Sequence, residues 1–171
     1  DLVPRPVSPY GVTKIAAEHL VTLYSSQFSV PTISLRYFTV YGPRQRPDMA
    51  FNRFARAALK GEELVIYGDG KQSRDFTFID DIVAANIAAA QCREHGAVLN
   101  LGGGTQATVL DVLDIIRSDV GAIKLRYEDR QVGDARHTSA DTSRAQSLLG
   151  FSPKVGLAEG IRREVEWMRS V

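Results

Sequence analysis

Tyr10 and Lys14 are the residues near the start of the chain whose types and spacing could do chemistry. They stand four positions apart, so in a helix their side chains lie one turn apart on the same face. A phenol acts as a base near neutral pH only when its anion is stabilised, which a neighbouring ammonium group can do. The pair could therefore be an acid/base couple, although the same spacing also occurs by chance on many helices.

The element that must position this pair is a helix that begins beside it. Ser8 is a good N-cap, and Pro9 suits the first helical position because its missing N–H would have no partner there. From Pro9 to about Phe28, apolar residues recur at helical spacing. The sequence therefore predicts a long amphipathic helix that carries Tyr10 and Lys14 in its first turns.

The rest of the chain alternates between short strands and helices. Apolar runs, glycines and capping residues predict a strand over 31–37, a ligand-carrying loop over 38–48, a helix over 49–60, a hairpin within 64–78, a helix over 80–94, a strand over 98–101, a helix over 108–119, a strand over 124–127, and helices near 142–149 and 157–168. Thr108 and Asp111 approximate a capping box at the start of the helix over 108–119. This order predicts an α/β fold with short connections.

Composition argues against several classes of partner. The 171 residues carry a formal net charge of +1 with acids and bases interspersed, so we expect no nucleic acid partner. No apolar segment approaches the roughly 20 residues of a membrane span, so we expect no membrane partner. The three histidines and Cys92 lack the spacing of metal ligands, and no metal site is expected. Because Cys92 is the only cysteine, a reducing, cytoplasmic setting is favoured.

The length suits one domain or a large piece of one. The chain begins with Asp1 ahead of a proline-rich entry, and we expect it to be a fragment of a longer protein.

Residues 102–104 are all glycine and lie between a predicted strand and a predicted helix, where a phosphate-binding loop would stand. The dinucleotide fingerprint requires the spacing G-x-G-x-x-G. Residues 105–107 supply no third glycine. We therefore interpret the triplet as a structural turn.

Five segments have the order and spacing of one known family. They are Pro-Tyr-Gly-x-x-Lys at 9–14, Leu-Arg-Tyr-Phe-Thr-Val-Tyr-Gly-Pro at 35–43, Gly-Asp-Gly-x-x-x-Arg-Asp-Phe at 68–76, Asn-Leu-Gly at 100–102 and Gly-Asp at 133–134. Together they resemble the C-terminal half of the extended short-chain dehydrogenase/reductase family, specifically its nucleotide-sugar epimerases and dehydratases. The resemblance implies that 1–171 holds the last elements of a Rossmann-like α/β fold and the nucleotide-sugar-binding subdomain, with the N-terminal NAD-binding half absent.

The resemblance implies NAD as the cofactor and a UDP-sugar as the substrate. Tyr10 would be the acid/base that acts on a sugar hydroxyl, Lys14 would hold the nicotinamide ribose, and Tyr37 would border the nicotinamide. The fingerprint glycines and a catalytic Ser or Thr would lie upstream of this chain. The isolated chain is therefore expected to be inactive.

The resemblance also implies a nucleotide-sugar site. Tyr67 would lie against the nucleobase, and Arg74 would clamp the diphosphate with its forked donors. The base and ribose would also be lined by Ala50, Phe51 and Val65. The alternative is that Tyr67 and Val65 are ordinary strand residues and that Arg74 forms a surface ion pair with Asp75.

Two departures from the family pattern bear on the substrate. Many hexose epimerases of the family have Asn where Thr39 stands, and the run 39–50 is similar to the UDP-glucuronate 4-epimerase branch. Thr39 and Arg46 would then receive the sugar carboxylate, unless Arg46 only braces its loop. Asp134 keeps the family's Gly-Asp pair, but the arginine expected three residues earlier is Gln131. A diphosphate contact is therefore assigned to the neighbouring Arg130 against the usual spacing.

The function implied is NAD-dependent 4-epimerisation of a UDP-sugar, with UDP-glucuronate as the first candidate, through a 4-keto intermediate. The alternatives are a nucleotide-sugar 4,6-dehydratase, a UDP-glucuronate decarboxylase or a non-catalytic nucleotide-sugar-binding module. Members of the family commonly dimerise through the helix that carries the tyrosine, so a homodimer is expected for the full-length protein.

Overall fold

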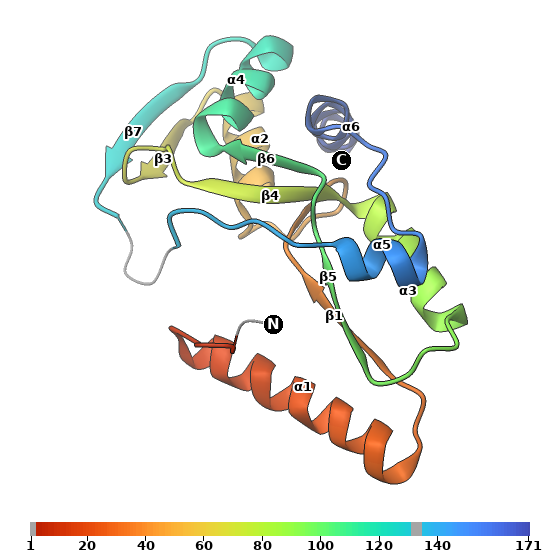
Figure 1. Cartoon of the computed structure of the whole chain (residues 1–171). Helices are drawn as coiled ribbons and strands as arrows, with labels where there is room; N and C mark the ends of the chain where they lie inside the picture. The colour runs from red at the N-terminus through yellow and green to blue at the C-terminus, as the bar shows by residue number, and fades with distance from the viewer. Residues whose placement is uncertain (1–2, 131–134) are drawn as a thin grey trace.

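A computed structural model describes residues 3–130 and 135–171 of the chain. The described residues form six helices and seven short strands (Figure 1). The helices are α1 (Pro9–Phe28), α2 (Ala50–Lys60), α3 (Ile79–Gln91), α4 (Val109–Val120), α5 (Ser143–Leu149) and α6 (Leu157–Arg169). The strands are β1 (Ile33–Tyr37), β2 (Thr39–Tyr41), β3 (Glu63–Tyr67), β4 (Ser73–Phe78), β5 (Ala97–Leu101), β6 (Thr105–Thr108) and β7 (Lys124–Glu128).

The long helix predicted around Tyr10 is confirmed as α1. The hydroxyl oxygen of Ser8 accepts a hydrogen bond from the Gly11 N–H at 3.1 Å, which satisfies one of the free donors of the first turn. The helix ends where Ser29 adopts a left-handed conformation, with φ of 54°. None of the α1 residues is buried in the described structure.

Parallel pairing dominates the sheets. β1 pairs with β5 in a parallel ladder that sets Ile33 opposite Ala97. β2 lies parallel to β4, and β6 runs antiparallel to the other edge of β4. β3 pairs in parallel with β7, with Glu63 opposite Lys124. Parallel strands need crossover connections, which the helices between them supply.

Two hydrophobic cores hold the strands and helices together. In the first, α2, α4 and α6 pack around strands β2, β3 and β4, and Tyr41 stacks on Phe51 with ring centres 4.9 Å apart. Phe76 meets the Phe51 ring edge-on, also at 4.9 Å. The second core lies between the β1–β5 pair and helices α3 and α5, where Leu99 and Leu101 are fully buried. The first core supports the site described below.

Several local predictions were wrong because they ignored distant partners. The predicted hairpin within 64–78 does not form: β3 and β4 follow one another but belong to different sheets (Figure 1). The turn between them is real, since Gly68 and Gly70 both have positive φ. The loop predicted over 38–48 contains β2, and β6 was not predicted at all. Both strands are short and form only because β4 lies between them.

The glycine triplet at 102–104 allows close packing of backbone and side chains. A Cβ on Gly102 would lie 2.6 Å from the Ala140 Cβ, and the Gly103 N–H donates to the Asp75 carboxylate at 2.6 Å. The close approach explains the glycines without a phosphate ligand.

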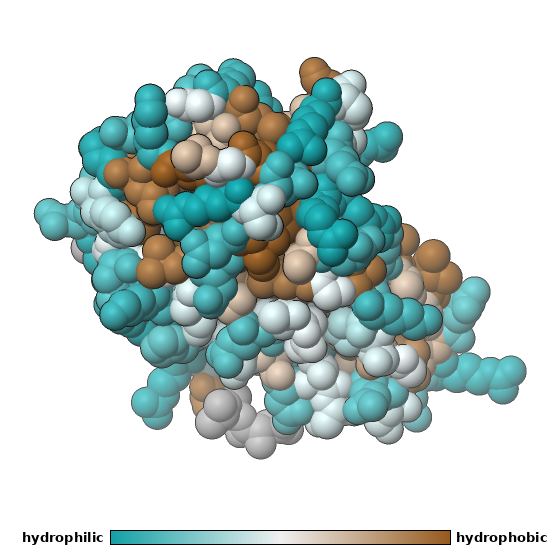
Figure 2. All heavy atoms as spheres, turned by 90° about the horizontal axis from the view of Figure 1, so that it is seen from above, coloured by the Kyte–Doolittle hydropathy of each residue, from teal (hydrophilic) through white to brown (hydrophobic). Residues whose placement is uncertain are grey.

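Apolar side chains are exposed on several of the described elements. Seen from the side on which α4 and α6 lie, apolar surface appears at the centre, bordered by hydrophilic residues (Figure 2). On α1 the large exposed apolar side chains are Tyr10, Val12, Leu20, Leu23, Tyr24 and Phe28. None of the helices in the described ranges combines the length and apolar character that crossing a membrane requires.

Candidate functional site

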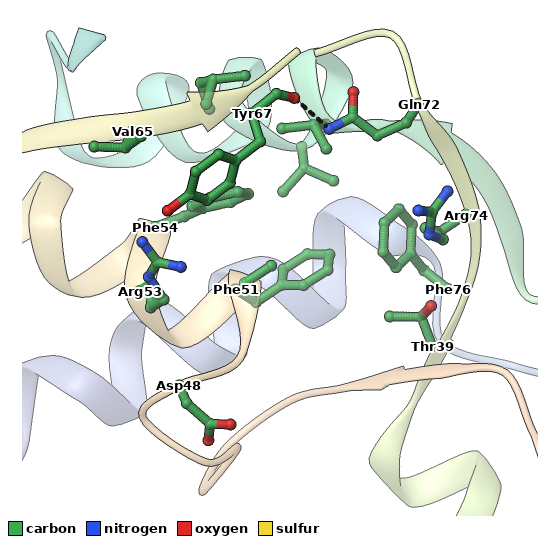
Figure 3. A pocket seen from close by; sticks show the side chains of 14 residues that line it. Thr39, Asp48, Phe51, Arg53, Phe54, Val65, Tyr67, Gln72, Arg74 and Phe76 are labelled. Carbon is green, nitrogen blue, oxygen red and sulfur yellow. Dashed lines mark hydrogen bonds between the residues drawn. The ribbon is translucent and has the colours of Figure 1, made fainter. Parts of the chain in front are cut away.

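A pocket of about 310 Å³ opens over the first core, between β2, β3, β4, α2 and α4 (Figure 3). Six residues that the sequence assigned to substrate binding line it, and they come from four separate elements: Thr39, Ala50, Phe51, Val65, Tyr67 and Arg74. The tertiary structure therefore brings together residues that lie up to 35 positions apart in the chain.

Strand geometry explains how these side chains reach the pocket. Val65 and Tyr67 are two residues apart on β3, so they point to the same face of the strand. On β4, Arg74 and Phe76 face the pocket for the same reason. Thr39 on β2 lies directly opposite Phe76 in the parallel ladder.

The first turns of α2 form another wall of the pocket, and the aromatic Phe51 reaches in from there. Its ring is 2% exposed and packs edge-on against Phe76, so part of the wall is fixed by the core itself.

The polar residues Asp48, Arg53 and Gln72 also line the pocket and were missed by the sequence analysis. Arg53 points toward Tyr67 from the facing helix α2 (Figure 3). The Gln72 amide donates to the Tyr67 carbonyl oxygen at 3.1 Å and braces the end of β3. The spacing of Arg53 from Ala50, one helical turn, could have indicated that both face the same side. Gln72 carries no comparable signal.

Arg74 and Asp75 point to opposite sides of β4. Arg74 donates to the Ser73 carbonyl oxygen at 2.8 Å. Asp75 is only 3% exposed, and its carboxylate accepts from the Gly103 and Ala140 N–H groups at 2.6 and 2.9 Å. Asp75 is therefore not the acid of a surface ion pair, because its carboxylate is buried and bonded to backbone N–H groups.

Arg46 lies beside the pocket and is not among the described residues that line it. Its guanidinium bonds the Asp48 carboxylate at 3.0 Å and contacts the Met49 sulfur at 3.7 Å. Both members of the ion pair are well exposed, so the pair is weak and can exchange partners. Thr39 is on the pocket wall, whereas Arg46 bonds the lining residue Asp48.

Arg130 and Asp134 are the other two residues predicted to contact the diphosphate. Arg130 lies beside the turn that follows β3, where a Cβ on Gly68 would be 3.7 Å from the Arg130 Cβ. Asp134 falls outside the described residues.

Tyr10 and Lys14 form a pair on α1, with the Lys14 ammonium nitrogen 5.1 Å from the centre of the Tyr10 ring. In the described ranges neither of them lines the pocket. The Tyr10 side chain is 70% exposed, and Lys14 is exposed as well. An accessible ammonium and a phenol are donors that suit ribose hydroxyls, so this pair is chemically compatible with a dinucleotide. The Tyr37 hydroxyl instead donates to the Asn86 side chain at 2.7 Å.

The family model for the "NAD dependent epimerase/dehydratase family" matches residues 1–102. An uncharacterized UDP-glucose epimerase of Bacillus subtilis is 44% identical over 97% of this chain and 53% of its own length. The UDP-glucuronate 4-epimerase of Thermodesulfobacterium geofontis is 37% identical over 98% of this chain and 52% of its own. The chain thus spans about half the length of the curated relatives it matches.

Solved structures agree with these relatives. The UDP-glucuronic acid 4-epimerase of Bacillus cereus, in complex with UDP-glucuronic acid and NAD, superposes with a TM-score of 0.95 at 43% identity. That comparison covers 99% of this chain and 55% of the other. MoeE5 in complex with UDP-glucuronic acid and NAD gives a TM-score of 0.94 at 45% identity, over 99% of this chain and 58% of the other.

These comparisons correct the expected placement of the chain within the family fold. The description as a C-terminal half, built around the substrate-binding subdomain, is wrong: the match to the NAD-dependent family model lies in residues 1–102. That stretch alternates helices and strands from α1 to β5, with the parallel pairs β1–β5 and β2–β4. Such alternation is the Rossmann-like α/β arrangement of the family. NAD is the cofactor of this family, and relatives have been solved with NAD bound. The chain belongs to the NAD-dependent epimerase/dehydratase family.

Proposed function

We propose that the protein containing this chain is an NAD-dependent isomerase that inverts C4 of a UDP-sugar, with UDP-glucuronate as the substrate. The observation that carries the proposal is the pocket, where Thr39, Tyr67 and Arg74 converge from three strands. Relatives with 43–45% identity, which have been solved in complex with UDP-glucuronic acid and NAD, support the same substrate.

The pocket suits the nucleotide part of such a substrate. The Tyr67 ring offers an aromatic face to a base, and the Arg74 guanidinium offers forked donors to a diphosphate. The Phe51 and Val65 side chains keep the base and ribose in apolar surroundings, and Ala50 leaves room beside them. Arg130 is a further candidate cation for the diphosphate, and Asp134 is proposed to lie near it.

The sugar end of the substrate is proposed to lie by Thr39 and Arg46. Arg46 already binds a carboxylate, that of Asp48, and a uronic acid could replace that partner with little cost because the pair is exposed. The Thr39 hydroxyl can donate to the same carboxylate. This arrangement favours UDP-glucuronate over UDP-glucose.

Tyr10 is proposed to take and return the proton of the sugar 4-hydroxyl. Lys14, 5.1 Å from the ring centre, stabilises the phenolate form and holds a ribose hydroxyl, and Tyr37 borders the nicotinamide. NAD, when bound, supplies the hydride acceptor and donor for C4. Inversion follows when the 4-keto sugar presents its other face, so Tyr10 serves both half-reactions.

The lone cysteine supports a reducing, cytoplasmic location, and the exposed apolar residues of α1 are consistent with a homodimer of the full-length protein.

The variant Tyr10→Phe tests the proposal in the full-length protein. Turnover of UDP-glucuronate to its C4 epimer should fall by at least about 100-fold, since the proton acceptor is lost, while UDP binding persists. Tyr24→Phe, an exposed tyrosine of the same helix, is the matched control and should keep wild-type turnover. Full activity in the Tyr10 variant, or a wild-type preference for UDP-glucose, would contradict the proposal. Nucleotide-sugar binding without turnover in the wild type would indicate a non-catalytic module.

A further inference from the structure

Glu164 on α6 is a buried acid that the proposed chemistry does not use. Glu164 is 1% exposed, and one of its carboxylate oxygens accepts a hydrogen bond from the Gly42 N–H at 3.1 Å. Its other oxygen has no hydrogen-bond partner among the described residues. A buried carboxyl group is costly unless it is paired, so its bond to Gly42 calls for an explanation beyond packing.

Gly42 is the residue at which the chain leaves β2, and its position suits only glycine. Its φ is 132°, and a Cβ there would lie 2.7 Å from the Ile79 Cγ2 and 2.9 Å from the Phe78 ring. The backbone N–H is therefore held in one orientation, toward Glu164.

The segment 42–49 behaves as one hydrogen-bonded unit. The Gln45 N–H donates to the Gly42 carbonyl oxygen at 3.1 Å, and the Met49 N–H donates to the Arg46 carbonyl oxygen at 3.0 Å. The Gln45 side chain donates to the Val40 carbonyl oxygen at 2.9 Å and accepts the N–H of Asn52 at 3.0 Å. Gly42 is therefore bonded to Gln45, the residue next to Arg46.

The middle of this unit, at Gln45, is bonded to α2. The Asn52 side chain, 1% exposed, donates to the Gln45 carbonyl oxygen at 2.8 Å from the first turn of α2. The unit is thus tied to α2 through Gln45 and to α6 through Gly42, and Glu164 supplies the side-chain acceptor on the α6 side.

Asp81 does not share this task, although it lies in the same core. Its two carboxylate oxygens accept the N–H groups of Lys154 and Val155, each at 3.1 Å, which fixes the chain ahead of α6. The nearby Tyr41 hydroxyl lies 3.5 Å from the Gly156 carbonyl oxygen. Asp81 and Tyr41 therefore bind the segment before α6, whereas Glu164 binds the segment after β2.

We propose that Glu164 is a positioning residue: by holding the Gly42 N–H it sets the unit 42–49, and with it Arg46 and Asp48, at the sugar end of the pocket. The proposal rests on the proposed function, because Arg46 is assigned there to the sugar carboxylate. The nucleotide end depends on β3 and β4, where Tyr67 and Arg74 lie. Loss of the Gly42 bond should therefore affect the sugar end selectively.

Two variants of the full-length protein separate this role from simple stabilisation. Glu164→Leu removes the acceptor, and kcat/KM for UDP-glucuronate should fall about tenfold, while the Kd for UDP changes by less than about twofold. Glu164→Gln keeps an amide oxygen for the Gly42 N–H and should restore kcat/KM to within about twofold of wild type. The Kd is measured by calorimetry with UDP alone, which requires no turnover.

Ile161→Val is the matched control, because Ile161 is equally buried on α6 but does not bond Gly42. It should lower stability and leave both constants unchanged. Unchanged kcat/KM in the leucine variant, or equal losses of kcat/KM and UDP affinity, would overturn the positioning role. If the wild-type protein itself does not epimerise UDP-glucuronate, the proposed function fails instead, and the two failures are thereby distinguished.

Discussion

At the scale of single residues, burial controls the acid–base properties of the first core. Burial raises the pKa of Glu164 to about 7, and the hydrogen bond from the Gly42 N–H opposes this shift only partly. Burial also raises the pKa of Tyr41, and the negative charges of Asp81 and Glu164 add to the effect. Tyr41 therefore stays neutral at any physiological pH and serves the core as a packed ring. Glu164, by contrast, changes charge near neutrality.

Glu164 should make stability depend on pH. In the unfolded chain its carboxyl group titrates near 4.5, and in the folded protein near 7. Between these values the folded state holds a proton that the unfolded state releases, so stability falls as pH rises through this window. Glu164→Gln removes this dependence, and at pH 8 the variant should be more stable than wild type by up to about 3 kcal/mol.

Urea unfolding of the full-length protein at pH 4.5 and pH 8 measures this difference. At pH 4.5 the two proteins should have the same free energy of unfolding. Glu159→Gln changes an exposed carboxylate of the same helix, paired with Arg162 at 3.5 Å, and should have little effect at either pH. A wild type that is the more stable protein at pH 8 would contradict the raised pKa.

At the scale of elements, the contact of α6 with β2 and β4 determines how closely the first core packs. Gly160 is the closest point, because a Cβ there would lie 2.7 Å from the Phe78 ring and would also overlap the Tyr41 ring. Arg163, one turn further along α6, lies over the Phe78 ring with its guanidinium carbon 4.5 Å from the ring centre. It also bonds Asp80 at 2.8 Å. The absence of a side chain at Gly160 therefore sets the helix-to-sheet distance.

Gly160→Ala should lower the free energy of unfolding by about 2 kcal/mol, because the added methyl group overpacks this contact. Gly156→Ala is the control at the start of the same helix, where no described heavy atom lies within 4 Å of the added Cβ. It should cost less than about 1 kcal/mol, roughly the difference between Gly and Ala at an N-cap. Denaturant unfolding of both variants measures the two costs, and equal costs would show that α6 can move away from the sheet.

At the scale of the whole molecule, α1 is the element most weakly attached within the described residues. It buries none of its residues there. Its ion pair to β1 joins Glu18 and Arg36 through two hydrogen bonds of 2.6 Å, and this pair lowers the pKa of Glu18 and raises that of Arg36. Because most helix stability in proteins comes from packing, the length of α1 alone does not protect it.

Hydrogen exchange on the 171-residue chain should therefore divide the helices. Amides of α1 should exchange much faster than those of α4, which buries Val112, Leu113 and Ile116 and begins with a complete capping box. α4 is the internal control, since both helices are observed in one sample. Equal protection of α1 and α4 would mean that α1 is covered in solution, for example by a second copy of the chain.

The sequence by itself determined what depends on neighbours along the chain. The start of α1 at Ser8 and Pro9, the capping box of Thr108 and Asp111, and the end of α2 at residue 60 were all predicted, because caps and turns use residues within one helical turn. The period of apolar residues likewise predicted α1, α2 and α6. The family resemblance also supplied six of the residues that line the pocket.

Only the tertiary structure decided which elements meet. β3 pairs with β7, some 60 residues away, instead of forming a hairpin with β4, and β2 and β6 exist only beside β4. Gln72 joins the pocket, and Glu164 reaches Gly42, through contacts for which the local sequence carries no signal. The physical reason is that strand pairing and core packing bring distant segments together. Which segments pair depends on how much apolar surface the rest of the fold leaves to be buried, and a local stretch of sequence does not contain that information.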